Sequence, residues 1–150
     1  MNSFPISSYS TWQSLFIMKK TSVSIYLLLI GFVFIVFGFA YLFFPSLMIE
    51  QSGMQIPTPG SKADAWAMYA GLQIGFGAFL LVCAKEPHLR AAGFLSVAFI
   101  FGGIAIGRTL GVMYFQAGDL FNLSALSIEW PGALFALYLF HKHEPPKASV

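Results

Sequence analysis

Charged side chains are scarce in this chain, at 9% of its 150 residues against 57% apolar residues. Soluble domains carry about 25% charged residues, because a surface that faces water needs them. The formal net charge of +2, without a lysine- or arginine-rich arm, also argues against a nucleic-acid partner. These shortages exclude an ordinary soluble domain and indicate a surface that faces a lipid bilayer.

Cysteine is almost absent, and the single Cys83 excludes an internal disulfide. The sequence also lacks the common catalytic signatures: no Gly-x-Ser-x-Gly, Cys-x-x-Cys, P-loop or dinucleotide fingerprint occurs. His141 and His143 lie in the C-terminal tail without the further ligands that a metal ion needs. We therefore expect no enzyme, no cofactor and no metal site.

Four long apolar runs dominate the chain, at residues 23–44, 65–84, 91–115 and 120–140. Each has roughly 20 residues or slightly more, enough for a helix to cross a hydrocarbon core of ~30 Å. Their continuous apolarity predicts helices rather than the alternating strands of a barrel. The short links between the last three runs make those helices antiparallel neighbours. The sequence thus predicts an all-α integral membrane four-helix bundle over residues 23–140.

The flanking segments are polar. We expect residues 1–22 to form an unstructured extension, part of which lies outside the protein if translation starts at Met18. The first run is too long for the apolar part of a signal peptide, so we interpret it as a retained span. Residues 141–150 form a tail. Six cations lie on the predicted side of both termini, and Lys62 is the one cation on the other side. This asymmetry predicts cytoplasmic termini in a multi-pass protein of the cell inner membrane.

Two ionisable residues fall inside predicted spans, Arg108 in the third and Glu129 in the fourth. Such residues are costly in lipid unless they find a partner or water. Arg108 lies eleven residues before Asp119 in the connecting turn, and Glu129 lies ten residues after it. Equal distances from the turn of an antiparallel hairpin mean equal depth, so we predict an ion pair between them. Tyr69 and Gln73 are four residues apart at a similar depth in the second span.

The predicted cluster of Tyr69, Gln73, Arg108 and Glu129 has two interpretations. It forms a buried site for a polar head group or a proton path, or it holds the helices in register by polar contacts. A proton-exchanging role for Glu129 is disfavoured, because a neighbouring arginine keeps a carboxylate ionised.

Small residues recur every four positions in two of the spans. Stripes of this kind let helix backbones approach closely. We expect them to pack the second span against the third, and the alternative is a homodimer face. In the fourth span, Pro131 follows Glu129 closely and predicts a helix kink beside the carboxylate. The predicted packing glycines are Gly71, Gly75, Gly103, Gly107 and Gly111.

Two sequence blocks, AMYAGLQIGFG at residues 67–77 and FGGIAIGRTLG at residues 101–111, carry a resemblance together with Glu129. They are similar to a family of small bacterial membrane proteins catalogued as a domain of unknown function (number 4345). The resemblance covers about residues 23–140 and implies four spans and a membrane location, without an activity. Two positions depart from the family pattern. Trp66 stands where members often have arginine, and Gly118 precedes Asp119 where the order is often reversed.

These patterns support two functional hypotheses. The first is a structural or accessory membrane protein that associates with itself or with another membrane protein. The alternative is a protein that binds or transports a small amphiphilic ligand at the intramembrane polar cluster. An enzyme acting on lipid would need a nucleophile or a metal, which the sequence does not offer.

Overall fold

The structure, a computed structural model, describes residues 7–143, and within that range it contains helices and no strand. The three longest helices are α1 (Ser7–Phe43), α5 (Arg90–Phe115) and α6 (Leu120–His143). Shorter elements fill the chain between α1 and α5 in the order α2 (Pro45–Ser52), α3 (Pro59–Ala65), η1 (Trp66–Gly71), α4 (Leu72–Lys85) and η2 (Pro87–Leu89).

Within residues 7–143, four stretches of helix are long and apolar enough to cross a membrane. They agree with the predicted runs to within a few residues, except that the second begins six residues earlier. The all-α, four-span prediction is therefore confirmed. Helix α1 begins at Ser7, so the helix extends through most of the predicted polar extension. The C-terminal tail beyond residue 143 lies outside the described residues. The spans are Ser24–Phe43, Pro59–Lys85, Pro87–Phe115 and Leu120–Lys142.

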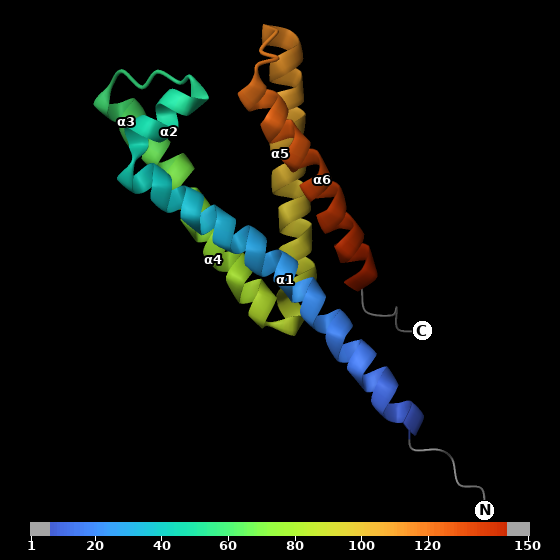
Figure 1. The fold of residues 1–150 in the computed structure, drawn as a ribbon. Coiled ribbons are helices and arrows are strands. Elements are labelled where there is room, and N and C mark those ends of the chain that lie inside the picture. The colour runs from blue at the N-terminus through green and yellow to red at the C-terminus, as the bar shows by residue number, and fades with distance from the viewer. Residues whose placement is uncertain (1–6, 144–150) are drawn as a thin grey trace, which may run out of the picture.

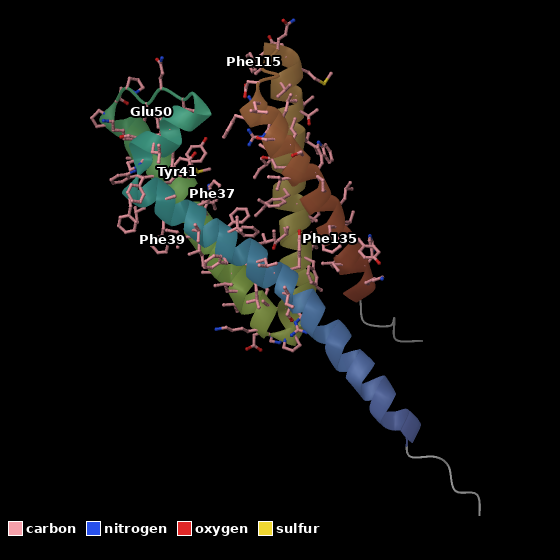
Figure 2. All side chains as sticks on the ribbon, viewed as in Figure 1. Phe37, Phe39, Tyr41, Glu50, Phe115 and Phe135 are labelled. Carbon is pink, nitrogen blue, oxygen red and sulfur yellow. The ribbon has the colours of Figure 1, made fainter. Side chains whose placement is uncertain are left out.

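The spans pair in the order of the chain, the first with the second and the third with the fourth, whereas the second and third spans, expected to be neighbours, approach each other only near their connection. Helix α1 packs along α4, and α5 packs along α6, each pair antiparallel. The two pairs meet at the end where η2 joins α4 to α5, and they diverge toward the other end (Figure 1). We call these the closed end and the open end. Helices α2 and α3 and the α5–α6 turn lie at the open end, where Figure 2 places Glu50 and Phe115.

The buried core lies toward the closed end and takes residues from all four spans. Phe94 and Val97 of α5 are fully buried, as are Leu27 of α1 and Leu80 of α4. Tyr26 of α1 adds a polar link, because its hydroxyl donates a hydrogen bond of 2.9 Å to the carbonyl oxygen of Gly132 in α6. The apolar side chains on the outer faces stay exposed, as Phe39 shows in Figure 2. Exposed apolar side chains of this kind suit a surface that faces lipid.

Two facing glycines bring the α1 and α4 backbones into direct contact. A Cβ atom built on Gly77 would lie 2.6 Å from the carbonyl oxygen of Gly31, and one on Gly31 would lie 2.9 Å from that of Gly77. No residue with a side chain fits at such distances without moving a backbone. Gly38 is similar, since its Cβ would lie 2.6 Å from the Ile74 side chain. Close packing by small residues therefore occurs between the first and second spans.

The five predicted packing glycines do not pack the second span against the third in this structure, and the alternative, a homodimer face, stays a prediction. A Cβ atom on Gly75, Gly103, Gly107 or Gly111 would meet nothing within 4 Å, and one on Gly71 would meet only the Trp66 carbonyl oxygen, at 3.8 Å. The reason is the divergence of the two pairs, which separates the second and third spans away from the closed end. These glycines face open space within this chain.

Two local features modify the second and fourth spans. Residues Trp66–Gly71 form a π-helical segment between α3 and α4, where the hydrogen bonds run from i to i+5. Such segments are uncommon and often lie at functional sites. Helix α6 runs without a break through Pro131, so the proline does not end the helix. A kink at Pro131 stays a prediction.

Candidate functional site

Arg108 and Glu129 form the predicted ion pair, between α5 and α6. The Arg108 Nε atom lies 3.0 Å from each carboxylate oxygen of Glu129, and Nη2 lies 2.8 Å from Oε1. The Arg108 side chain is 26% exposed and that of Glu129 is 12% exposed. Because α6 starts at Leu120, Glu129 lies well inside the span, and the depth argument from the Asp119 turn holds.

Asn122, which was not among the residues predicted from the sequence, extends this pair toward the open end. Its Oδ1 atom accepts a hydrogen bond of 3.0 Å from Nη1 of Arg108. Its amide nitrogen donates to a carboxylate oxygen of Asp119 at 2.7 Å and to the Ala117 carbonyl oxygen at 3.2 Å. Asn122 lies seven residues before Glu129, which is two helical turns and therefore the same face. That spacing was the available signal.

Asp119 caps α6 and anchors this polar chain at the turn. Its carboxylate accepts a hydrogen bond of 3.0 Å from the backbone N–H of Asn122, and its carbonyl accepts the first intrahelical bond, from Leu123. The backbone and side-chain hydrogen bonds from Asn122 hold the pKa of the Asp119 carboxyl below its usual value. The ionised form of Asp119 is thus the one that the turn stabilises.

A cavity of about 500 Å³ lies where the two helix pairs begin to diverge. Its walls are mostly apolar and come from both pairs, with Phe34 and Phe76 on one side and Ile100 and Ile104 on the other. The α2–α3 connection contributes residues at the open end. The remaining lining residues are Met54, Ile56, Ser61, Asp64, Ala65, Met68, Tyr69, Leu72 and Gln73. A cavity of this size falls within the range of small-molecule sites, about 300–1,000 Å³.

Tyr69 and Gln73 both line this cavity, so they share a face as the spacing predicted. The Tyr69 ring stacks on Tyr41 with 5.1 Å between ring centroids, and its hydroxyl lies 3.6 Å from the Met54 sulfur, a weak acceptor. The half-buried amide of Gln73 has no hydrogen-bond partner among the described residues. An amide in this position is available to a ligand.

The predicted four-residue cluster therefore divides into two groups. Tyr69 and Gln73 belong to the cavity between the pairs, whereas Arg108 and Glu129 belong to the α5–α6 pair. Among the described residues, no hydrogen bond or ion pair joins the two groups. The prediction that four residues at a similar depth form one cluster therefore does not hold, because the two groups lie on different helix pairs.

Arg90 is a second buried cation, at the closed end. It is 9% exposed, and its Nε and Nη2 atoms each lie 3.4 Å from the Ala84 carbonyl oxygen, which is long for a hydrogen bond. Its Nη1 atom is buried and has no hydrogen-bond partner among the described residues. Within the described part of the chain, no three His, Cys, Asp or Glu side chains are placed to hold a metal ion.

Comparison with known proteins assigns the chain to a family but to no activity. The family described as "Domain of unknown function (DUF4345)" matches residues 22–140, which include all four spans. No curated protein matches the chain, and no solved structure matches it. The ion pair, the polar turn and the cavity all lie within the matched residues, and the chain belongs to the DUF4345 family.

Proposed function

We propose that this chain is a multi-pass protein of a bacterial inner membrane that binds a small amphiphile between its two helix pairs and catalyses no reaction. The cavity of about 500 Å³ at the divergence of the pairs carries this proposal. A mostly apolar wall with a few polar groups is the usual composition of a small-molecule site. A ligand with an apolar chain and one polar end matches that composition.

The amide of Gln73 adds a second argument. The amide lines the cavity and has no hydrogen-bond partner among the described residues, so it can both donate to and accept from a ligand. A helix that needed only packing at this position would be more stable with leucine. The unpartnered amide is therefore better explained by a ligand that bonds to it than by packing of α4.

We place the closed end at the cytoplasmic face in this proposal, because Lys85, Arg90 and Lys142 lie there and Lys62 alone lies at the open end. The cavity then lies nearer the extracytoplasmic face. A topology reporter fused to the C-terminus should give a cytoplasmic signal. An extracytoplasmic signal would reverse the orientation proposed for the cavity.

Native mass spectrometry tests the binding role. The full chain is released from membranes in mild detergent beside Gln73→Leu and a matched control, Gln55→Leu. Gln55 is exposed on the α2–α3 connection and does not line the cavity, so both variants lose one amide but only Gln73→Leu changes the site. We expect a small-molecule adduct on the wild type and on Gln55→Leu, and its loss on Gln73→Leu. A bare wild-type chain, or an adduct retained by Gln73→Leu, would contradict the proposal.

One observation favours a second candidate, an accessory protein that associates with a partner helix. Gly103, Gly107 and Gly111 form a stripe along α5 that no described residue of this chain covers. Stripes of small residues commonly receive a second helix in membranes. In the same spectra, a dimer or another bound polypeptide that disappears in Gly103→Leu would support this candidate, whereas a ligand adduct unchanged in Gly103→Leu would count against it.

A further inference from the structure

A second cavity, of about 450 Å³, opens on the α5–α6 pair beside the ion pair. Arg108 and Asn122 are its polar lining residues, and Gly107 and Gly111 form part of its wall. Glu129 does not line it, so the carboxylate lies behind the guanidinium as seen from the cavity. Ile104 lines this cavity and the larger one, which places the two cavities on either side of a single side chain.

The guanidinium of Arg108 retains hydrogen-bonding capacity on this side. A guanidinium has five N–H groups. The Nε group and one Nη2 group are directed to Glu129, and one Nη1 group is directed to Asn122. Two N–H groups remain, one on each terminal nitrogen. Asn122 offers no further donor, because its amide nitrogen already bonds to Asp119 and Ala117.

The one charged side chain that faces the cavity favours an anionic acceptor. The guanidinium is the one formally charged group in the lining, and no acidic side chain lines this cavity. Glu129 holds the guanidinium in place, and Glu129 and the more distant Asp119 offset its charge from outside the cavity, so the free N–H donors rather than a net positive charge favour the anion. Arginine groups fixed by a carboxylate are well suited to a second acceptor such as a phosphate or carboxylate oxygen.

Gly107 and Gly111 keep the approach to Arg108 open. A Cβ atom on either residue would meet nothing within 4 Å, so the missing side chains leave space that no other part of the chain fills. Leucine at either position would occupy that space without displacing the ion pair. Glycine at these two positions therefore leaves the guanidinium accessible from the cavity.

From these observations we infer that the ligand is an anionic amphiphile whose head group, a phosphate or a carboxylate, binds Arg108 and whose apolar chain passes Ile104 into the larger cavity. This inference rests on the proposed binding function and adds the charge of the ligand. The opposite arrangement would place a cationic head group at Asp64, which lines the larger cavity. Arg108 is favoured because its free donors lie in a half-buried site, whereas Asp64 is exposed.

The test compares three probes that share a twelve-carbon chain: dodecyl phosphate, dodecyltrimethylammonium and dodecanol. Each is titrated into the full chain in a neutral detergent, and binding is followed by native mass spectrometry. We expect dodecyl phosphate to bind at least about tenfold more tightly than the other two, the scale of one charge-assisted hydrogen bond. Gly107→Leu should abolish this preference. Gly103→Leu is the matched control, because Gly103 is equally open but does not line the cavity, and it should keep the preference.

Each other outcome has a defined meaning. Equal binding of all three probes, lost in Gln73→Leu, would overturn the anionic head group and leave the proposed binding function standing. Tighter binding of dodecyltrimethylammonium would assign the head group to Asp64 instead. Displacement of dodecyl phosphate by inorganic phosphate at equal concentration would indicate a site for a free anion and would overturn the amphiphile. Saturable binding of none of the probes would overturn both proposals.

Discussion

Replacing Arg108 by leucine is the sharpest test of the ion pair. The change leaves the Glu129 carboxylate, only 12% exposed, without its cation, and it leaves Oδ1 of Asn122 without its donor. Removing one partner of a buried ion pair destabilises a protein by about 3–5 kcal/mol. We expect a loss of about 3 kcal/mol, the lower limit, because a quarter of the Arg108 side chain is exposed and water screens it.

The double variant Arg108→Leu/Glu129→Gln measures the coupling free energy between the two side chains. It removes both charges, so no uncompensated carboxylate remains in the span. We expect it to recover about half of the loss, which corresponds to a coupling free energy of about 1.5 kcal/mol or more. The control is Glu129→Gln alone, which leaves Arg108 with Asn122 and with partial access to the cavity.

Reversible unfolding of the full chain in bicelles, driven by sodium dodecyl sulfate, measures all four free energies at neutral pH. The linear dependence on denaturant gives each free energy of unfolding. Additive effects of the two single variants, within about 0.5 kcal/mol, would show that Arg108 and Glu129 are not coupled. That result would refute the argument that equal distances from the turn make the two side chains partners.

Three further predictions follow from the packing, the closed end and the turn. Gly77→Ala should destabilise the chain by about 2 kcal/mol or more, because its Cβ would lie 2.6 Å from a backbone oxygen. Gly75→Ala, whose Cβ would meet nothing within 4 Å, should be neutral or stabilising. Unfolding curves of the two variants measure the difference, and equal effects would contradict the prediction. Arg90→Met should change the free energy of unfolding by less than about 1 kcal/mol, because the loss of two long hydrogen bonds is offset by removal of the unpartnered Nη1. A destabilisation as large as that of Arg108→Leu would refute the prediction. The folded pKa of Asp119 is lowered, so its contribution to the free energy of unfolding is present above its ordinary pKa of 3.8 and is lost as the pH falls through the folded pKa. Asp119→Asn should remove this part of the pH dependence, measured by unfolding curves from pH 6 to about pH 2. A variant with the same pH dependence as the wild type would contradict the prediction.

The fold was largely predictable from the sequence, because span length and apolarity depend on local composition. The α5–α6 contact was predictable as well, since a short turn fixes the depth of residues on both of its sides. Asn122 was available to the same reasoning, two helical turns from Glu129. The turn constrains depth well because only four residues, 116–119, separate the two helices.

The separation of the second span from the third was not predictable, for a physical reason. Small residues show where a close approach is possible, but they do not show which helix makes it. Gly31 and Gly38 are seven residues apart in an apolar run and form no four-residue stripe, yet they pack closely on α4, while a Cβ atom on the more regular α5 stripe would meet no described residue within 4 Å. The angle at which the pairs diverge depends on side-chain packing at the closed end. Tyr69 and Gln73 were therefore placed at the correct depth and assigned to the wrong neighbours.

The π-helical segment at residues 66–71 should make the second span more tolerant of a one-residue deletion at this segment than a regular α-helix is. A π turn holds one residue more than an α turn, so the segment contains a surplus residue. Deleting one residue there would restore a regular helix and leave the faces of α3 and α4 in their present directions. The same deletion in α5 would rotate everything after it by about 100° and would separate Arg108 from Glu129. Length variation among relatives of this protein should therefore concentrate at this segment.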